Sequence, residues 1–192
     1  MSSTSYEQWT TDRADALDEM DAAHTAVGGR QRGRRYATQQ INRSYAVLLA
    51  SQFQGFCRDL HIESVDHLVN SLSPTAMQLI VRNELLRNRQ LDRGNAQPAS
   101  LGTDFGRLRV DFWTQVTLHN AANSDRKAKL VELNDWRNAI VHQDFSPTKL
   151  GGEATLRLSR VQQWRRDCGY LAQSFDEVMR RHVGAVTGML PW

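Results

Sequence analysis

Residues 41–60, INRSYAVLLASQFQGFCRDL, form the stretch of sequence that decides the fold. Their large apolar side chains recur at intervals of three and four residues, the spacing that places side chains on one face of an α-helix. The series consists of Ile41, Tyr45, Leu48, Leu49, Phe53, Phe56 and Leu60. The pattern predicts a core helix that begins near Arg34 and continues through Val65 and Leu68 to Leu72, with a bend or break near His61.

Helix start and stop signals flank this core segment. A first helix is expected from Ser5, which has the spacing of a capping box with Gln8, to the Gly28-Gly29 pair. On the other side, Ser73-Pro74 is typical of an N-cap followed by proline at the first helical position. We expect that helix to stop by Gly94.

The middle of the chain combines a loop with further helical stretches. Residues 92–102 contain two glycines and a proline and are expected to form a loop. Thr103 is then expected to cap a helix that carries Phe105, Leu108, Phe112 and Val116 on one stripe. Another helix should begin after Asn123-Ser124 and end near Phe145-Ser146-Pro147, because proline disfavours helix at the preceding residue.

The last long helix has a regular three-then-four heptad pattern, which packs either inside the chain or against a second copy. Its members are Val161, Trp164, Cys168, Leu171, Phe175 and Val178. Since no convincing alternating strand appears, the fold class is all-α, a helical bundle of about six or seven helices. The 192 residues are expected to form a single domain, residues 1–192, with residues 185–192 as a short C-terminal tail.

Composition narrows the setting and the class of protein. The longest apolar run falls short of the roughly 18 residues that span a bilayer, so no membrane partner is expected. Cys57 and Cys168 each lie inside an apolar helical pattern, and one such pair is not a disulfide framework. These features favour a cytoplasmic location.

Arginine carries most of the positive charge, with 21 arginines against 3 lysines in a chain of net charge +3. Four of them, Arg30, Arg32, Arg34 and Arg35, fall within six residues after Gly28-Gly29. The planar guanidinium suits phosphate, so this cluster is interpreted as a phosphate-contacting patch. The alternative interpretation is a solvated loop and helix start.

Several enzyme classes lack their signatures in this sequence. The phosphate-binding G-x4-G-K-[ST], the dinucleotide-binding G-x-G-x-x-G and the hydrolase G-x-S-x-G motifs do not occur. The six histidines include no H-E-x-x-H, and His61 and His67 are out of register for a shared metal. We therefore expect neither a metal site nor a cofactor.

The segment 133–143, LNDWRNAIVHQ, places a cation within an apolar stripe. On a helical wheel Arg137 lies about 20° from Leu130 and about 40° from Leu133. A buried cation must be paired or functional, so Arg137 has a catalytic interpretation and two structural ones, an ion pair with a neighbouring helix or a face covered by an oligomer partner. His142 lies about 140° away, at the expected helix end, where the helix dipole favours an imidazolium. It is interpreted as a helix cap, or as part of a site that a second copy completes.

Arg137-Asn138-x-x-x-His142, on the penultimate helix and followed by a turn and one long helix, resembles the R-x4-H signature of the HEPN superfamily (higher eukaryote and prokaryote nucleotide-binding domains). Residues 45–60 resemble the early core helix of stand-alone bacterial HEPN proteins, and the likeness covers roughly residues 34–185. Two positions depart from the family. Gln54 with Arg58 stands where an E-x3-[KR] pair is common, on a face that RNA, a partner or solvent could cover. Asp144 replaces the Tyr of toxins that a partner enzyme silences.

The resemblance implies a metal-independent endoribonuclease, a two-fold homodimer whose paired motifs form one cleft. It implies that His142 is the general acid and base, Arg137 the clamp on the phosphate and transition state, and Asn138 a positioning group. Arg58 and the cluster Arg30, Arg32, Arg34 and Arg35 would contact RNA, with an affinity that falls as salt rises. The implied setting is a toxin or antiviral-defence component with a cognate antitoxin or defence-system partner.

Two other classes of function remain open. One is a non-catalytic HEPN-like module that binds RNA, nucleotide or protein, because a fold does not fix a function. The other is an oligomeric scaffold that uses the seam from Val161 to Val178.

Overall fold

The computed structural model describes residues 1–28, 35–153 and 155–192. Within these ranges the chain forms eight α-helices and one 3-10 helix, and no β-strand, which confirms the all-α prediction. The helices are α1 (Thr4–Thr10), α2 (Asp12–Gly28), α3 (Arg35–Asn70), α4 (Thr75–Leu86), η1 (Gln90–Asp92), α5 (Pro98–Gly106), α6 (Phe112–His119), α7 (Asn123–His142) and α8 (Leu158–Thr187). Among the described residues, no helix is both long enough and apolar enough to cross a membrane.

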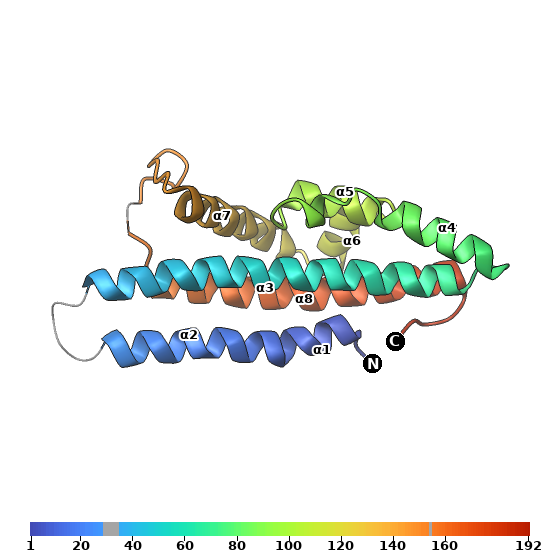
Figure 1. The fold of residues 1–192 in the computed structure, drawn as a ribbon, viewed down its shortest axis with the longest axis horizontal. Helices are drawn as coiled ribbons and strands as arrows, with labels where there is room; N and C mark the ends of the chain where they lie inside the picture. The colour runs from blue at the N-terminus through green and yellow to red at the C-terminus, as the bar shows by residue number, and fades with distance from the viewer. Residues whose placement is uncertain (29–34, 154) are drawn as a thin grey trace.

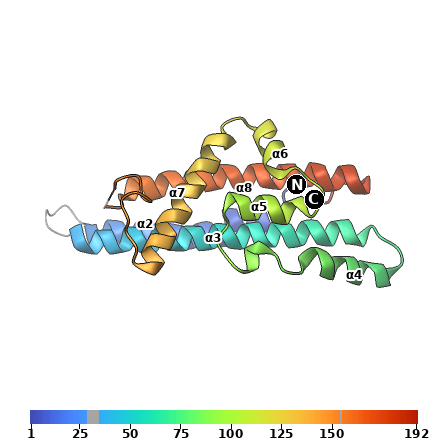
Figure 2. The same cartoon turned by 90° about the horizontal axis from the view of Figure 1, so that it is seen from above.

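The two longest helices form the centre of the bundle. Figure 1 shows α3 and α8 side by side, with α1 and α2 along one face and α4 to α7 on the opposite face. Viewed from above in Figure 2, α7 crosses both α8 and α3 at a steep angle. This crossing places the C-terminal end of α7, where the R-x4-H motif lies, beyond the edge of the central layer.

The predicted core helix is confirmed by α3, which runs without interruption past His61 to Asn70. The side chains of Tyr45, Leu49, Phe53, Phe56 and Leu60 are all fully buried. Burying one large apolar side chain contributes about 1.5–3 kcal/mol, so this face supplies much of the free energy that holds the layers together.

The heptad pattern of α8 packs inside the chain. All six predicted seam residues, from Val161 to Val178, are buried against the rest of the bundle. The two cysteines are also buried and free, and burial raises the pKa of both thiols. Of the two alternatives for the seam, the structure therefore supports intramolecular packing.

The N-terminal helix differs from its prediction in its cap and in its continuity. Ser3, not Ser5, is the N-cap, and its hydroxyl accepts a hydrogen bond from the Tyr6 amide. Glu63 of α3 accepts the Ser5 amide and hydroxyl instead. The helix breaks at Thr11, whose hydroxyl bonds back to the Glu7 carbonyl, a local contact that competes with helix continuation.

The region between α4 and α7 contains more structure than the sequence indicated. The expected loop at 92–102 ends at Pro98, which opens α5, and the expected continuous helix from Thr103 is divided between α5 and α6. Phe105 and Phe112 reach the core on opposite sides of this turn and stack with ring centroids 4.2 Å apart. Phe105 and Phe112 are seven residues apart, and they meet because the chain turns between α5 and α6, not because they share one helix face. In α4 the first helical residue is Thr75, one position after the predicted start.

Candidate functional site

The end of α7 is fixed by the backbone immediately after His142. Gln143 adopts a left-handed conformation, with φ 55° and ψ 30°, and terminates the helix. The amides of Gln143 and Asp144 both donate to the Ala139 carbonyl. This C-terminal cap turns the chain back over the last helical turn, so Asp144 lies near His142.

A pocket of about 340 Å³ opens at this helix end. Four of its lining residues follow the helical spacing i, i+3, i+4 and i+7, and the other two come from the turn that follows the helix. The lining residues are Asp135, Asn138, Ala139, His142, Asp144 and Lys149. Two of the three predicted catalytic residues, Asn138 and His142, therefore share one pocket.

The charged groups of the pocket differ in their surroundings. Lys149 Nζ lies 2.7 Å from Asp144 Oδ2, and this hydrogen-bonded pair lowers the pKa of Asp144 and raises the pKa of Lys149. Partial burial raises the pKa of the Asp135 carboxyl. The pocket thus combines an imidazole, a carboxylate held in its ionised form, a carboxyl that more readily retains a proton, and an ammonium.

Arg137 is half-buried and is not among the residues that line the pocket. Within the described part of the chain no carboxylate forms an ion pair with it; its Nη1 donates to Asn138 Oδ1 at 3.2 Å. The prediction of a cation at the centre of a buried stripe is wrong. Arg137 lies at one edge of the buried side of α7: Ile140 is half-buried against the core, whereas Val141, about 40° from Arg137 on a helical wheel, is 48% exposed.

Asn138 is held by a short chain of amide contacts. Its Oδ1 accepts from Asn95 Nδ2 at 2.7 Å as well as from Arg137. The Asn95 loop is held in turn by Gln54, whose Nε2 donates to the carbonyls of Leu91 and Gly94. Gln54, at the position where the HEPN proteins that the sequence resembles often have Glu, therefore supports the motif from the neighbouring helix. It is half-buried and hydrogen-bonded within the chain, so of the three covers open for this face, solvent alone does not fit at this position.

The predicted RNA-contacting arginines either lie away from this pocket or fall outside the residues that the structure describes. Arg58 is exposed, with its Nε 3.9 Å from Asp59 Oδ1, and it does not line the pocket. Arg30, Arg32 and Arg34 lie outside the described residues, and so does the side chain of Arg35, the first residue of α3.

Asp135 and Lys149 line the pocket but are not among the site residues that the sequence predicts. Asp135 stands seven residues before His142, about 20° away on a helical wheel, so helical spacing alone could have indicated it. Lys149 follows the turn and meets the pocket through a conformation that no periodicity predicts. Among the described residues, no cluster of three or more His, Cys, Asp or Glu side chains is arranged to hold a metal ion.

Comparisons with known proteins return no relative. No family model, no curated protein and no solved structure matches this chain. The likeness to the HEPN superfamily therefore stays a prediction, which depends on residues 45–60 and on the segment around Arg137 and His142.

Proposed function

We propose that this protein is a metal-independent endoribonuclease that cleaves RNA by attack of the 2′-hydroxyl. The observation that carries the proposal is the pocket at the end of α7, where His142 and Asn138 meet a cation, Lys149, and a carboxyl, Asp135. Histidine is the side chain that enzymes most often use for general acid–base catalysis, and the exposed imidazole of His142 lies where a substrate can reach it.

The reaction needs a proton acceptor, a proton donor and positive charge at phosphorus. The 2′-oxygen loses its proton to a base and forms a bond to phosphorus, while the bond from phosphorus to the 5′-oxygen breaks and that oxygen takes up a proton. The products are a 2′,3′-cyclic phosphate and a 5′-hydroxyl. His142 serves as acid and base, and the raised pKa of Asp135 suits it to the complementary proton transfer.

Two cations near Asn138, Arg137 and Lys149, would stabilise the negative charge of the phosphate. Arg137 can bind phosphate through two parallel hydrogen bonds, and its contact with Asn138 orients the guanidinium. Asn138 is itself oriented by Asn95. Lys149 adds a cation inside the pocket that Arg137 does not line.

A two-fold homodimer would complete this site. In a single chain Arg137 is not among the residues that line the pocket of His142, and a second copy with the same exposed helix end could bring its own Arg137 to the phosphate. Two-fold symmetry would then provide two complete sets of residues in one cleft. The biological setting we propose is a toxin or antiviral-defence component, controlled by a cognate antitoxin or defence-system protein.

The second candidate is a non-catalytic HEPN-like module that binds RNA, nucleotide or protein. Two observations favour it: Lys149 is already paired with Asp144, and Gln54 is committed to the backbone of the 91–94 loop. A module of this kind would hold RNA at the same surface without breaking it.

The deciding experiment incubates the full chain with a mixed RNA pool in excess EDTA. Wild type is compared with His142→Ala and Arg137→Ala, and with the matched controls His24→Ala and Arg166→Ala, which change the same residue types outside the pocket. We expect wild type to produce new cyclic-phosphate and 5′-hydroxyl ends. The two motif variants should lose these ends, and the two controls should keep them. Intact RNA with retained RNA binding would favour the binding module, and loss of cleavage in EDTA would contradict a metal-independent mechanism.

A further inference from the structure

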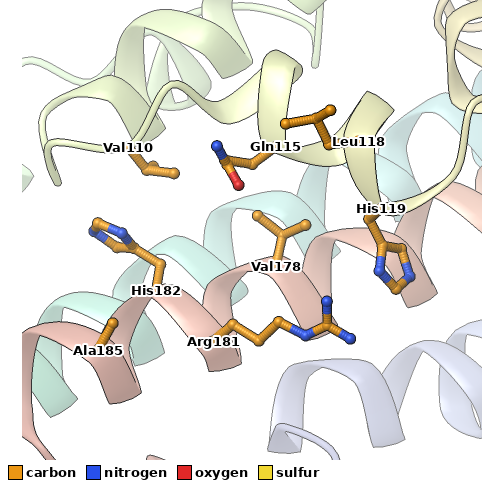
Figure 3. Close-up of a pocket in the computed structure, with 8 residues that line it drawn as sticks. All are labelled: Val110, Gln115, Leu118, His119, Val178, Arg181, His182 and Ala185. Atoms are coloured by element: carbon orange, nitrogen blue, oxygen red, sulfur yellow. The ribbon is translucent and has the colours of Figure 1, made fainter.

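A second concave site lies between α6 and the C-terminal half of α8, on residues that take no part in the proposed ribonuclease. Figure 3 shows this groove, which has a volume of about 370 Å³, within the range of small-molecule sites. Its lining residues are Val110, Gln115, Leu118, His119, Val178, Arg181, His182 and Ala185. Two imidazoles and a guanidinium line it, and among the described residues none that lines it is acidic.

Arg181 is held in place by the carboxylate of Glu177, but the local charge stays positive because a second arginine shares that carboxylate. Arg181 Nε donates to Glu177 Oε1 at 2.6 Å, and Arg180 binds the same carboxylate through two nitrogens. Hydrogen bonds from Arg180 and Arg181 lower the pKa of Glu177 to about 2. The trio therefore keeps one net positive charge at neutral pH, and the two terminal nitrogens of Arg181 remain for a ligand.

His182 has one ring nitrogen committed to the fold. Its Nε2 lies 2.7 Å from the Leu108 carbonyl, and because a carbonyl only accepts, Nε2 carries the proton. Nδ1 is then the ring nitrogen that remains for a ligand. In Figure 3, His182 lies toward one end of the groove, the Arg181 guanidinium and the His119 ring lie toward the other, and Val178 and Gln115 lie between them.

The groove thus has a cationic end and an apolar floor. Val110 and Val178 are almost fully buried beneath it, while Leu118, on its rim, is 75% exposed. A tetrahedral phosphate accepts several charge-assisted hydrogen bonds at once, which matches the guanidinium and imidazole donors at one end. A compact ring attached to the phosphate would cover the valines and bring its polar atoms near Gln115 and His182.

We propose that this groove binds a small organic phosphomonoester, with its phosphate between Arg181 and His119 and its ring or apolar body over Val178. Arg181, which meets the phosphate, and His182, which lies near the body, are oriented before binding by Glu177 and by the Leu108 carbonyl. Such preorganisation lowers the entropic cost of binding. The site is independent of RNA cleavage, because it shares no lining residue with the pocket at the end of α7.

Calorimetric titration of the full chain with phenyl phosphate tests the proposal. Inorganic phosphate tests the phosphate alone, and benzoate tests a ring that carries a carboxylate instead. We expect saturable one-to-one binding of phenyl phosphate that is tighter than binding of either comparison ligand. Arg181→Gln should weaken it by at least about tenfold, the value of a lost charge-assisted hydrogen bond.

Arg166→Gln is the matched control, because Arg166 is an exposed arginine on the same helix, bonded to Gln163 and outside the groove. It should leave phenyl phosphate affinity within about twofold of wild type. His119→Gln alters the second phosphate donor and leaves Glu177, Arg180 and Arg181 unchanged. It should weaken binding as Arg181→Gln does. Equal losses in Arg166→Gln and Arg181→Gln, equal affinity for phenyl phosphate and inorganic phosphate, or no saturable binding up to about 10 mM would each overturn the proposal.

Discussion

Two histidines of this chain, His61 and His142, have opposite surroundings. His61 is fully buried: its Nε2 lies 3.0 Å from the Asp104 carbonyl, and Nη1 of Arg89 lies 3.5 Å from its Nδ1. Burial lowers the pKa of His61 to about 4. His142 is exposed at the end of α7 and lines an open pocket. The difference separates a histidine that is hydrogen-bonded inside the core from one that solvent and ligands can reach.

The strongest way to break this comparison is to remove His142. His142→Ala should lower the rate of RNA cleavage by about 10² to 10⁴-fold, the usual contribution of a general acid or base. Because the side chain is exposed, the free energy of unfolding should change by less than about 0.5 kcal/mol. Cleavage rates check the expected loss of activity, and urea unfolding of the same preparation checks the expected small change in stability. A cleavage rate within tenfold of wild type would remove His142 from the mechanism.

Removal of His61 should have the opposite signature. His61→Ala leaves a cavity and removes the partner of the Asp104 carbonyl, so we expect a loss of about 3 kcal/mol in unfolding free energy. Cleavage by the molecules that remain folded should stay within tenfold of wild type. Urea unfolding measures the loss, and the half-buried His24 provides a matched His24→Ala control. A variant as stable as wild type would show that the buried imidazole does not stabilise the fold.

The titration of His61 sharpens the same contrast. Its pKa in the folded protein is about 4, below the value of about 6.5 for an unperturbed histidine. Between these pH values the unfolded chain binds a proton that the folded chain does not, so stability falls as the pH falls from about 6.5 to about 4. The total contribution is about 3 kcal/mol. Below about pH 4 this contribution is constant.

A non-titrating variant isolates that contribution from the carboxyl groups. The measurement is the unfolding free energy of wild type and of His61→Gln at several pH values between 4 and 7. The difference between the two proteins should shrink as the pH falls, because only wild type loses the histidine contribution. Parallel curves would mean that the pKa of His61 is not lowered in the folded state.

Helical periodicity predicted the elements that depend on long apolar stripes and missed those that depend on distant partners. Five of the seven stripe residues of α3 and all six seam residues of α8 are buried as expected, while Ile41 and Leu48 are half-buried. The cap of α1 was misplaced because Glu63, far along the chain, binds the Ser5 amide and hydroxyl. At the candidate site, the resemblance to the R-x4-H motif pointed to Asn138 and His142, which line one pocket. Helical periodicity could not predict that Arg137 is only half-buried and has no carboxylate partner among the described residues, because both depend on which other elements pack against α7.

The smallest expected effect concerns the loop that joins the surroundings of the two histidines. At one end of this loop the Leu91 amide donates to Asp104 Oδ2, beside His61. At the other end Asn95 donates to Asn138, within the motif of His142. Asn95→Ala removes the second connection and changes neither histidine. It tests whether the loop positions the motif or merely packs beside it.

Loss of this one hydrogen bond, worth about 1 kcal/mol, should lower kcat for RNA cleavage by about fivefold. KM should be unchanged, because Asn95 is expected to act through Asn138 rather than through the substrate. Asn83→Ala, an exposed asparagine of α4, is the control and should match wild type in both constants. A rise in KM at constant kcat would instead make Asn95 part of the RNA-binding surface. Unchanged constants would restrict the loop to a structural role, and the orientation of Asn138 would then depend on its contact with Arg137.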